Sequence, residues 1–398
     1  MDVYNRFSDI ATKMRGSEIR ELLKYADNPN VISFAGGLPN PKSFPLDILK
    51  QIFLDQLQNS GSKIFQYGTT EGLSELREEL SKKLDKDYNI KAPKDNILIL
   101  TGSQQGLYMV GKVLINPGDL VITEAPTYIA ALSAFRANYA KIKGIEMDEN
   151  GLKTEVLEDT LKNSDVMPKF IYVIPTFQNP AGITMSLDRR KHLLEIASKY
   201  DLLIFEDDPY GHLRFSGDPI PPIAGLDKEG RTLYMGTFSK VLAPGLRIGY
   251  IAGHPDIIKK LNITKQVTDL CSNSLSQYIA YEYLKNDYID DQIPKIIEMY
   301  RRKRDLMINT LQDLAPKDTE WTRPDGGMFL WLKTNPKIDA EKMFPNAIKN
   351  GVAYVIGSAF YPERNGKNTM RLNYTYPTDA NIVEGIKRLL KTIKEENQ

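Results

Sequence analysis

Lys240 and Arg247 stand seven residues apart in the segment GTFSKVLAPGLR, just after the short apolar run Leu233 to Met235. Such a run is typical of a buried strand, so the lysine is expected where the strand gives way to a loop. A lysine held there can form a Schiff base with a carbonyl compound if its neighbours favour the neutral amine. Arg247 adds fixed positive charge, which could favour the neutral amine and also bind a phosphate. A solvated pair on a surface turn is the alternative interpretation.

Functional side chains also follow other apolar runs. Ser103 and Gln104 lie in TGSQQG, where a helix begins, so they could hold an anion or form an ordinary N-cap. Tyr128, in EAPTY, places an aromatic ring at a strand end, although it could simply be a packed tyrosine. Asn179 lies in PTFQNPAG, where Pro180 favours an extended backbone that could aim the amide at a ligand.

Three adjacent carboxylates, Glu206 to Asp208, follow the apolar run Leu202 to Phe205. Carboxylates beside apolar β structure are costly unless a cation, a metal or a protonated ring nitrogen compensates them.

One ligand accounts for the functional side chains at all five strand ends. Pyridoxal phosphate needs a lysine for its aldehyde, a carboxylate for its ring nitrogen, donors for its phosphate and an aromatic ring to stack on. The sequence therefore predicts a pyridoxal phosphate site.

The elements that must position these residues follow an α/β rhythm between about residues 95 and 252. Short apolar runs alternate there with stretches of helix length, which predicts a mostly parallel sheet between helices. The runs are Ile97 to Leu100, Leu120 to Thr123, Phe170 to Ile174, Leu202 to Phe205, Leu233 to Met235 and Ile248 to Ala252. In such sheets ligands bind beyond the carboxyl ends of the strands.

After about residue 290 the pattern changes to a long charged helical stretch, the strand-like GGMFLWLK and a closing helix near Asp379 to Lys394. We therefore expect a large cofactor-binding domain over residues 49–290. A smaller α+β domain is expected from residues 1–48 and 291–398, with the N-terminal part covering substrate. The length of 398 residues agrees with two domains.

Composition excludes several functions. The 52 basic and 51 acidic residues give a net charge of +1, which provides no field for nucleic acid or an anionic membrane. Cys271 is the only cysteine, and the three histidines have no metal-binding spacing, so we expect neither a disulfide nor a metal. The N-terminus lacks the apolar core of a signal peptide, and no stretch is long enough to span a membrane. A cytoplasmic protein is expected.

The chain resembles the fold-type I pyridoxal-phosphate aminotransferases of class I/II, in the branch of 2-aminoadipate, kynurenine and archaeal aromatic aminotransferases. The resemblance covers nearly the whole chain and rests on SFAGGLPNPKSFP, QYGTTEGLSELREEL, TGSQQGL, EAPTY, PTFQNPAGITMS, EDDPYG, GTFSKVLAPGLRIGY, GGMFLW and MRLNY. It implies an α/β large domain with a mostly parallel seven-stranded sheet between helices, plus a smaller α+β domain.

The resemblance also implies a role for each matching residue. Lys240 is similar to the Schiff-base lysine, which also moves the proton between the substrate α-carbon and the cofactor. Asp207 resembles the carboxylate that pairs with the pyridine nitrogen, and Tyr128 the stacking ring. Tyr210 and Asn179 resemble the groups that hold the 3′-oxygen. The residues that resemble phosphate ligands are Ser103, Gln104, Ser239 and Arg247, together with Tyr67, which in the family comes from the other subunit and implies a homodimer.

Substrate recognition follows from the same resemblance. Arg371, in MRLNY, resembles the arginine that binds the substrate α-carboxylate, an assignment shared with Asn179; the alternative is a surface ion pair at a strand end. Gly37 and Leu38 lie in the segment that closes over substrate. Arg20 matches an arginine that moves to meet a distal carboxylate, although it could be an ordinary residue on a helix surface.

The implied activity is a ping-pong transfer of an amino group from an aromatic amino acid, 2-aminoadipate, kynurenine or glutamate to a 2-oxo acid, 2-oxoglutarate in particular. A lyase or decarboxylase on the same fold is one alternative. Another is the cofactor-binding module of a transcriptional regulator. Such regulators carry an upstream winged-helix domain, for which residues 1–48 have neither the length nor the charge.

Overall fold

The computed structural model describes residues 3–8, 11–12, 28 and 30–397. Its helices are α3 (Leu46–Ser60), α4 (Ser74–Tyr88), α5 (Ser103–Leu114), α6 (Ile129–Arg136), α7 (Thr154–Lys162), α8 (Leu187–Lys199), α9 (Ile223–Leu226), α10 (Pro255–Thr268), α11 (Ser274–Lys285), α12 (Tyr288–Leu314), α13 (Ala340–Lys349) and α14 (Asp379–Glu396). Its strands are β1 (Ile32–Ser33), β2 (Ile97–Leu100), β3 (Leu120–Ala125), β4 (Lys141–Asp148), β5 (Gly151–Leu152), β6 (Phe170–Val173), β7 (Leu203–Asp208), β8 (Thr232–Thr237), β9 (Gly249–Ala252), β10 (Glu320–Trp321), β11 (Phe329–Lys333), β12 (Val352–Ala353), β13 (Val355–Ile356) and β14 (Thr369–Asn373).

The central sheet has the order β2-β9-β8-β7-β6-β3-β4-β5. The pairs from β8 through β7, β6 and β3 to β4 are all parallel, whereas β9 runs antiparallel to both of its neighbours. The two-residue β5 adds a short antiparallel edge to the seven longer strands. The predicted α/β fold with a mostly parallel sheet is confirmed.

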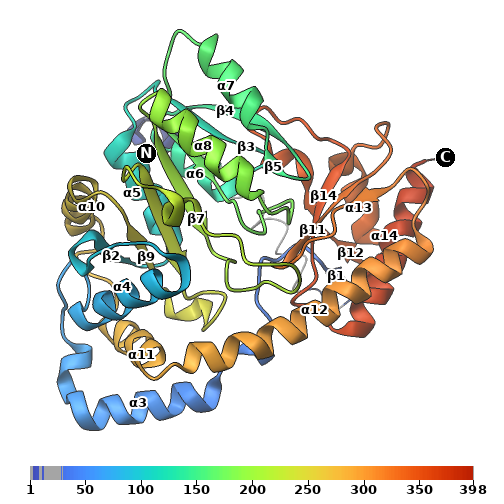
Figure 1. Ribbon diagram of the computed structural model, residues 1–398. Coiled ribbons are helices and arrows are strands. Elements are labelled where there is room, and N and C mark those ends of the chain that lie inside the picture. The colour runs from blue at the N-terminus through green and yellow to red at the C-terminus, as the bar shows by residue number, and fades with distance from the viewer. Residues whose placement is uncertain (1–2, 9–10, 13–27, 29, 398) are drawn as a thin grey trace.

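Helices cover both sides of this sheet because its strands are apolar on both faces. Alternate residues of β6 belong to different hydrophobic clusters: Phe170 and Tyr172 pack with α5, α6 and α10, whereas Ile171 and Val173 pack with α7 and α8. Figure 1 shows this layered arrangement around the sheet. The two packed layers fix the strand ends that carry the candidate site.

The strand ends differ from the sequence prediction in one respect that matters for the site. The apolar run suggested that the fourth predicted strand ends at Phe205, but β7 continues to Asp208 because Asp207 and Asp208 pair with Met235 and Gly236 of β8. The three carboxylates therefore lie within the strand rather than after it. Successive side chains of a strand point to opposite faces, so Asp207 is separated from its two acidic neighbours.

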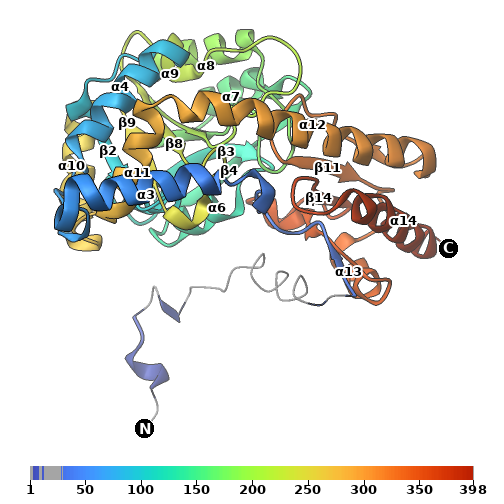
Figure 2. The ribbon, with the colours of Figure 1, turned by 90° about the horizontal axis from the view of Figure 1, so that it is seen from below.

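A second, antiparallel sheet has the order β10-β11-β14-β13, and β1 pairs with β12. Figures 1 and 2 show these strands with α13 and α14 at one end of the molecule, connected to the α11 side by the long helix α12. Ile32 and Ser33 of β1 join the N-terminal segment to this end through their pairing with β12. The boundaries at residues 49 and 290 stay a prediction. Among the described residues, none of the helices combines the length and apolar character that a membrane-crossing helix needs.

Candidate active site

The ends of β6, β7 and β8 border a cavity of about 900 Å³, which includes space open to solvent. It brings together most of the residues selected from the sequence: Gly37, Ser103, Gln104, Tyr128, Asn179, Asp207, Tyr210, Ser239, Lys240, Arg247 and Arg371. Ile174, Pro209, Thr237, Pro244 and Phe329 complete its lining. Leu38 and Tyr67 do not line the cavity, and Arg20 lies outside the described residues.

Lys240 follows β8 and is partly buried, with its Nζ donating a hydrogen bond of 2.9 Å to the Gly37 carbonyl oxygen. Burial lowers the pKa of Lys240 to about 8, and the positive charges of Arg371 and Arg247 contribute to the lowering. A larger fraction of this amine is therefore neutral near pH 7 than in an ordinary lysine. This is the condition that a lysine needs in order to act as a nucleophile or base.

Asp207 faces the cavity and is 3% exposed. Burial raises its pKa to about 7, although the hydroxyl of Tyr172, which donates to Oδ2 at 2.7 Å, opposes the rise. The neighbouring carboxylates are bound by the protein itself. Glu206 accepts from the backbone N–H groups of Ile223 and Ala224 at 2.9 and 2.8 Å.

Arg371 lies in β14 and is 2% exposed. Its guanidinium donates to Asn179 Oδ1 and to the Ala35 carbonyl oxygen, both at 2.9 Å, and its central carbon lies 4.1 Å from the centre of the Phe329 ring. The buried Nε atom has no hydrogen-bond partner. Burial lowers the pKa of Arg371 to about 10, so it remains a cation at neutral pH. A buried cation with an unused donor is suited to an incoming carboxylate.

The N-terminus of α5 borders the cavity next to Arg247. Gly102 has φ +77°, and a Cβ at this position would lie 2.2 Å from an Arg247 nitrogen, so the backbone and the guanidinium are in close approach. Ser103 begins the helix, and no side chain caps it. The free backbone N–H groups, with exposed Arg247 and the hydroxyl of Ser239, provide the donors that a phosphate needs.

Asn179 contacts both Tyr210 and Arg371 in the wall of the cavity. The Asn179 side-chain amide donates to Tyr210 Oη at 3.3 Å, and its oxygen accepts from Arg371. Burial raises the pKa of both Tyr210 and Tyr128 above the ordinary value for tyrosine, so both hydroxyls stay protonated. Asn179 therefore links Tyr210 to Arg371 across the cavity wall.

Sequence reasoning missed two buried groups that hold the loops of the site. Glu124 Oε2 accepts from the Ile174 N–H at 3.1 Å and from Gln178 Nε2 at 3.0 Å, and Gln178 in turn precedes Asn179. Burial raises the pKa of Glu124 to about 8. The acidic residue in EAPTY was a signal, because a carboxylate in an apolar strand needs a specific partner.

The second missed group is Lys265, in α10, whose side chain is fully buried. Its Nζ lies 2.7 Å from Asp269 Oδ1 and 3.1 Å from Gln105 Oε1, while the Thr101 hydroxyl donates to Asp269 at 2.7 Å. The network supports the TGSQQG segment, in which α5 begins. The only sequence signal was the spacing of Lys265 and Asp269 on one helix face.

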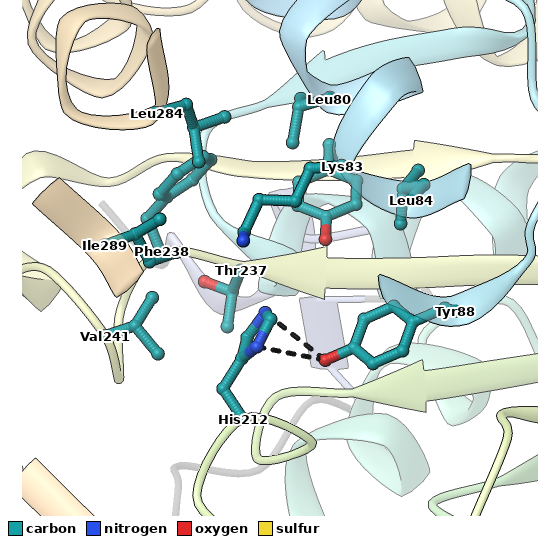
Figure 3. A pocket seen from close by; sticks show the side chains of 11 residues that line it. Leu80, Lys83, Leu84, Tyr88, His212, Thr237, Phe238, Val241, Leu284 and Ile289 are labelled. Carbon is teal, nitrogen blue, oxygen red and sulfur yellow. Dashed lines mark hydrogen bonds between the residues drawn. The ribbon is translucent and has the colours of Figure 1, made fainter. Parts of the chain in front are cut away.

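A smaller pocket of about 330 Å³ lies on the opposite side of the Lys240 loop and shares Thr237 with the cavity. Figure 3 shows His212 facing Tyr88, with Lys83 and apolar side chains around them. Tyr88 Oη lies 3.2 Å from His212 Nδ1, and Lys83 pairs with Asp87 at 2.9 Å and Asp290 at 2.7 Å. Tyr88, His212 and Lys83 thus all have partners within the protein.

The residues of the cavity fit pyridoxal phosphate. The orphaned Arg371 Nε, the close approach of Gly102 to Arg247 and the limited contacts of Lys240 and Asp207 leave donors and acceptors for a ligand. No group of three or more His, Cys, Asp or Glu side chains among the described residues is placed to hold a metal ion.

Comparison with known proteins identifies the class. The model of the aminotransferase class I and II family matches residues 35–389, so the chain belongs to that family. It is a pyridoxal-phosphate-dependent aminotransferase.

The more closely related proteins indicate the branch. The chain is 49% identical to aromatic-amino-acid aminotransferase 1 of Thermococcus litoralis, over 100% of this chain and 96% of that protein. It is 37% identical to a 2-aminoadipate transaminase of Thermus thermophilus, over 98% and 96%. The crystal structure of Pyrococcus horikoshii kynurenine aminotransferase, in complex with PMP, KYN as substrates and KYA as products, matches with a TM-score of 0.97 at 51% identity, covering 100% and 99%. The chain thus lies in the aromatic, kynurenine and aminoadipate branch.

Proposed function

We propose that this aminotransferase moves an amino group from an aromatic amino acid, 2-aminoadipate, kynurenine or glutamate to 2-oxoglutarate by a ping-pong mechanism. The observation that carries the proposal is one cavity that holds Lys240, with its lowered pKa, and the buried Arg371 guanidinium with an unused Nε. A base and a carboxylate site together are what amino-acid chemistry requires. The relatives named above support the choice of donors.

The cofactor would be held by groups from several strand ends. Asp207 would pair with the ring nitrogen, Tyr128 would stack on the ring, and Asn179 and Tyr210 would bind the 3′-oxygen. Ser103, Gln104, Ser239 and Arg247 would bind the phosphate. When bound, pyridoxal phosphate supplies an electron-accepting ring that stabilises negative charge at the substrate α-carbon.

The remaining residues act on the substrate. Arg371 would bind the α-carboxylate through paired donors and Asn179 would hold that arginine in place, as their 2.9 Å contact already does. Lys240 Nζ, once free, would take the proton from the α-carbon and return it later, which its pKa of about 8 favours at neutral pH. Gly37, whose carbonyl accepts from Lys240, would close the cavity together with Leu38.

Dual specificity for acidic and aromatic side chains is the hypothesis for substrate choice. Among the described residues that line the cavity the cations are Lys240, Arg247 and Arg371, each of which already has a role. A distal carboxylate would therefore need another cation, and Arg20 is the candidate from the sequence. An Arg20→Ala variant should lose activity with 2-aminoadipate or glutamate more than with aromatic donors; equal losses would overturn the hypothesis.

A homodimer would complete the phosphate site. Tyr67 is 79% exposed and does not line the cavity of its own chain, which supports donation to a second copy. Large apolar side chains near Tyr67 in the sequence are also exposed, including Leu46 at 68% and Phe65 at 63%. A face of this kind is typical of an interface.

Two experiments test these proposals. A panel of amino donors with 2-oxoglutarate, with the oxo-acid product identified, should give one oxo acid per amino acid consumed. A lyase would form product without any oxo acid, so an assay without acceptor separates the two activities.

The dimer is tested by mixing Lys240→Ala and Tyr67→Ala subunits. If Tyr67 acts across the interface, each hybrid dimer contains one intact site, and activity rises above that of either parent. If Tyr67 acts within its own chain, mixing restores no activity.

A further inference from the structure

Tyr172 has no role in the assignments above, yet its hydroxyl is the closest polar partner of Asp207. The side chain is 0% exposed, and Oη donates to Asp207 Oδ2 at 2.7 Å. The other carboxylate oxygen, Oδ1, receives no hydrogen bond from the described residues. We propose that Tyr172 is a positioning residue for the cofactor: its hydroxyl favours the ionised form of Asp207 and leaves Oδ1 for the ring nitrogen. The proposal rests on the assignment of Asp207 to that nitrogen.

The sheet places Tyr172 rigidly. It lies opposite Phe205 in the parallel β6–β7 pair, so a long side chain can reach Asp207, two residues further along β7. Its ring packs edge-on against Phe135 and Phe205, with centroids 5.5 Å apart in both cases. The hydroxyl is therefore held at one position relative to the carboxylate.

The groups around Asp207 leave Tyr172 as its main stabilising contact. Titratable groups that interact electrostatically with Asp207 come from β3, the start of α6, β7 and the following turn: Glu124, Tyr128, Asp208 and Tyr210, in addition to Tyr172. None of them is a cation. Burial and Asp208 both favour the neutral carboxyl, whereas the Tyr172 hydrogen bond favours the ionised one. Without this donor, Asp207 would take up a proton at a higher pH.

The opposite face of the sheet offers a matched control. Tyr234, in β8, is 2% exposed, and its hydroxyl donates to Asp208 Oδ2 at 2.9 Å. Asp208 does not line the cavity. Tyr172→Phe and Tyr234→Phe therefore remove the same kind of buried hydrogen bond, but only the first lies next to the site.

The test measures binding of pyridoxal phosphate to the apo forms of both variants and of the wild type between pH 6 and 9. A protonated Asp207 cannot form an ion pair with a protonated ring nitrogen. The affinity for pyridoxal phosphate should therefore fall as the pH is lowered. For Tyr172→Phe we expect roughly tenfold weaker binding at pH 7, with the acid-side decline moved up by about one pH unit. The affinity of Tyr234→Phe for pyridoxal phosphate should be within about twofold of that of wild type, because Tyr234 does not line the cavity.

Two further measurements keep the test decisive. A cofactor analogue with carbon in place of the ring nitrogen should bind Tyr172→Phe at least as tightly as wild type, because it has no pairing with the ionised carboxylate to lose. If the phenylalanine variant does not fold, 3-fluorotyrosine at position 172 preserves the shape and donates more strongly, so the acid-side decline should move to lower pH. Unchanged pH dependence in the folded variants would overturn the proposal.

An Asp207→Asn variant distinguishes the proposal for Tyr172 from the assignment of Asp207 to the ring nitrogen. If Asp207→Asn binds the cofactor as tightly as wild type, the assignment of Asp207 is wrong. If Asp207→Asn weakens binding but Tyr172→Phe does not, the assignment stands and only the role of Tyr172 is wrong.

Discussion

Both faces of β7 carry buried carboxylates, but these carboxylates differ in the number of hydrogen bonds that they accept from the protein. On the cavity face, Asp207 has one donor from the described residues, the hydroxyl of Tyr172. On the opposite face, Glu206 accepts two backbone N–H groups, and Asp208 accepts from Tyr234 and from the Gly211 N–H. Buried polar groups are normally satisfied within the protein, so incomplete satisfaction marks the face where a ligand binds.

The two pockets beside the Lys240 loop repeat this difference. In the pocket of Figure 3, Lys83 pairs with two aspartates and His212 contacts Tyr88. In the larger cavity, Lys240 contacts a carbonyl oxygen, and Arg371 keeps an unused donor. We infer that the smaller pocket stabilises the Lys240 loop, whereas the larger cavity performs the chemistry. Substitutions on the two sides should therefore affect different properties.

The largest difference is expected between the two lysines. Lys240→Ala should lower kcat by about 10³-fold or more, because it removes both the amine for the cofactor and the base. The apo form should unfold with a free energy at least equal to that of wild type, since a poorly solvated amine has been removed. Lys83→Ala should retain kcat within a few fold and lose roughly 1 kcal/mol of stability. Steady-state assays and urea unfolding of the apo proteins check both; comparable kcat losses would remove the distinction.

The next largest difference is expected between substitutions of the adjacent carboxylates Asp207 and Asp208. Asp207→Asn should lower kcat by roughly 10²-fold, because it weakens the hold on the protonated ring nitrogen. Asp208→Asn should instead destabilise the protein by about 1–3 kcal/mol, since it removes the charged acceptor for Tyr234 and Gly211.

The pH dependence of the unfolding free energy of the apo protein tests the state of Asp207 further. The pKa of Asp207 is raised by burial to about 7, so the folded state binds more protons than the unfolded state between about pH 4 and 7. Asp207 therefore contributes stability at low pH that is lost as the pH rises toward 7. The unfolding free energy of Asp207→Asn relative to wild type should increase across this range and then level off. A flat difference would show that Asp207 is not desolvated.

Arg371→Lys should have an intermediate effect. A lysine keeps the charge but loses the paired donors, so kcat/KM for amino acids should fall about 10–100-fold. Amines that lack the α-carboxylate should be affected much less, and a parallel assay of both substrates makes this comparison. Equal losses would indicate that Arg371 supports the fold rather than the carboxylate.

The smallest effect concerns the titration of Lys240. The rate of cofactor capture by the apo enzyme should rise through about pH 8, since burial and two arginines lower the pKa of this amine. Arg371→Met removes one positive charge, so the midpoint should move to higher pH, by roughly half a unit. Stopped-flow absorbance measures the rate. An unchanged midpoint would mean that Arg371 does not contribute to the lowered pKa of Lys240.

The sequence was sufficient to predict the residues that follow strands, such as Lys240 and Ser103, because apolar runs show where strands lie and ligands bind at their carboxyl ends. It was insufficient for Tyr172, because its contact depends on β6 and β7 being neighbours in register, which no local pattern shows. β4 was missed because charged residues interrupt the apolar ones in KIKGIEMD, so no continuous apolar run marks the strand.

Other features depend on contacts between distant parts of the chain. Lys265 and Gln105 are 160 residues apart, and Arg371 and Asn179 are 192 residues apart. Tyr67 is 79% exposed, and its contribution to a partner subunit stays a prediction.

The most direct test of the account is a single-turnover assay of the cofactor-loaded enzyme with an aromatic amino acid or 2-aminoadipate and no acceptor. The account predicts one equivalent of the 2-oxo acid per active site, after which the reaction stops until 2-oxoglutarate is added. Lys240→Ala should produce far less oxo acid on the same timescale. Continued product formation without an acceptor, or full product formation by Lys240→Ala, would contradict the central claim that this cavity carries out transamination through Lys240.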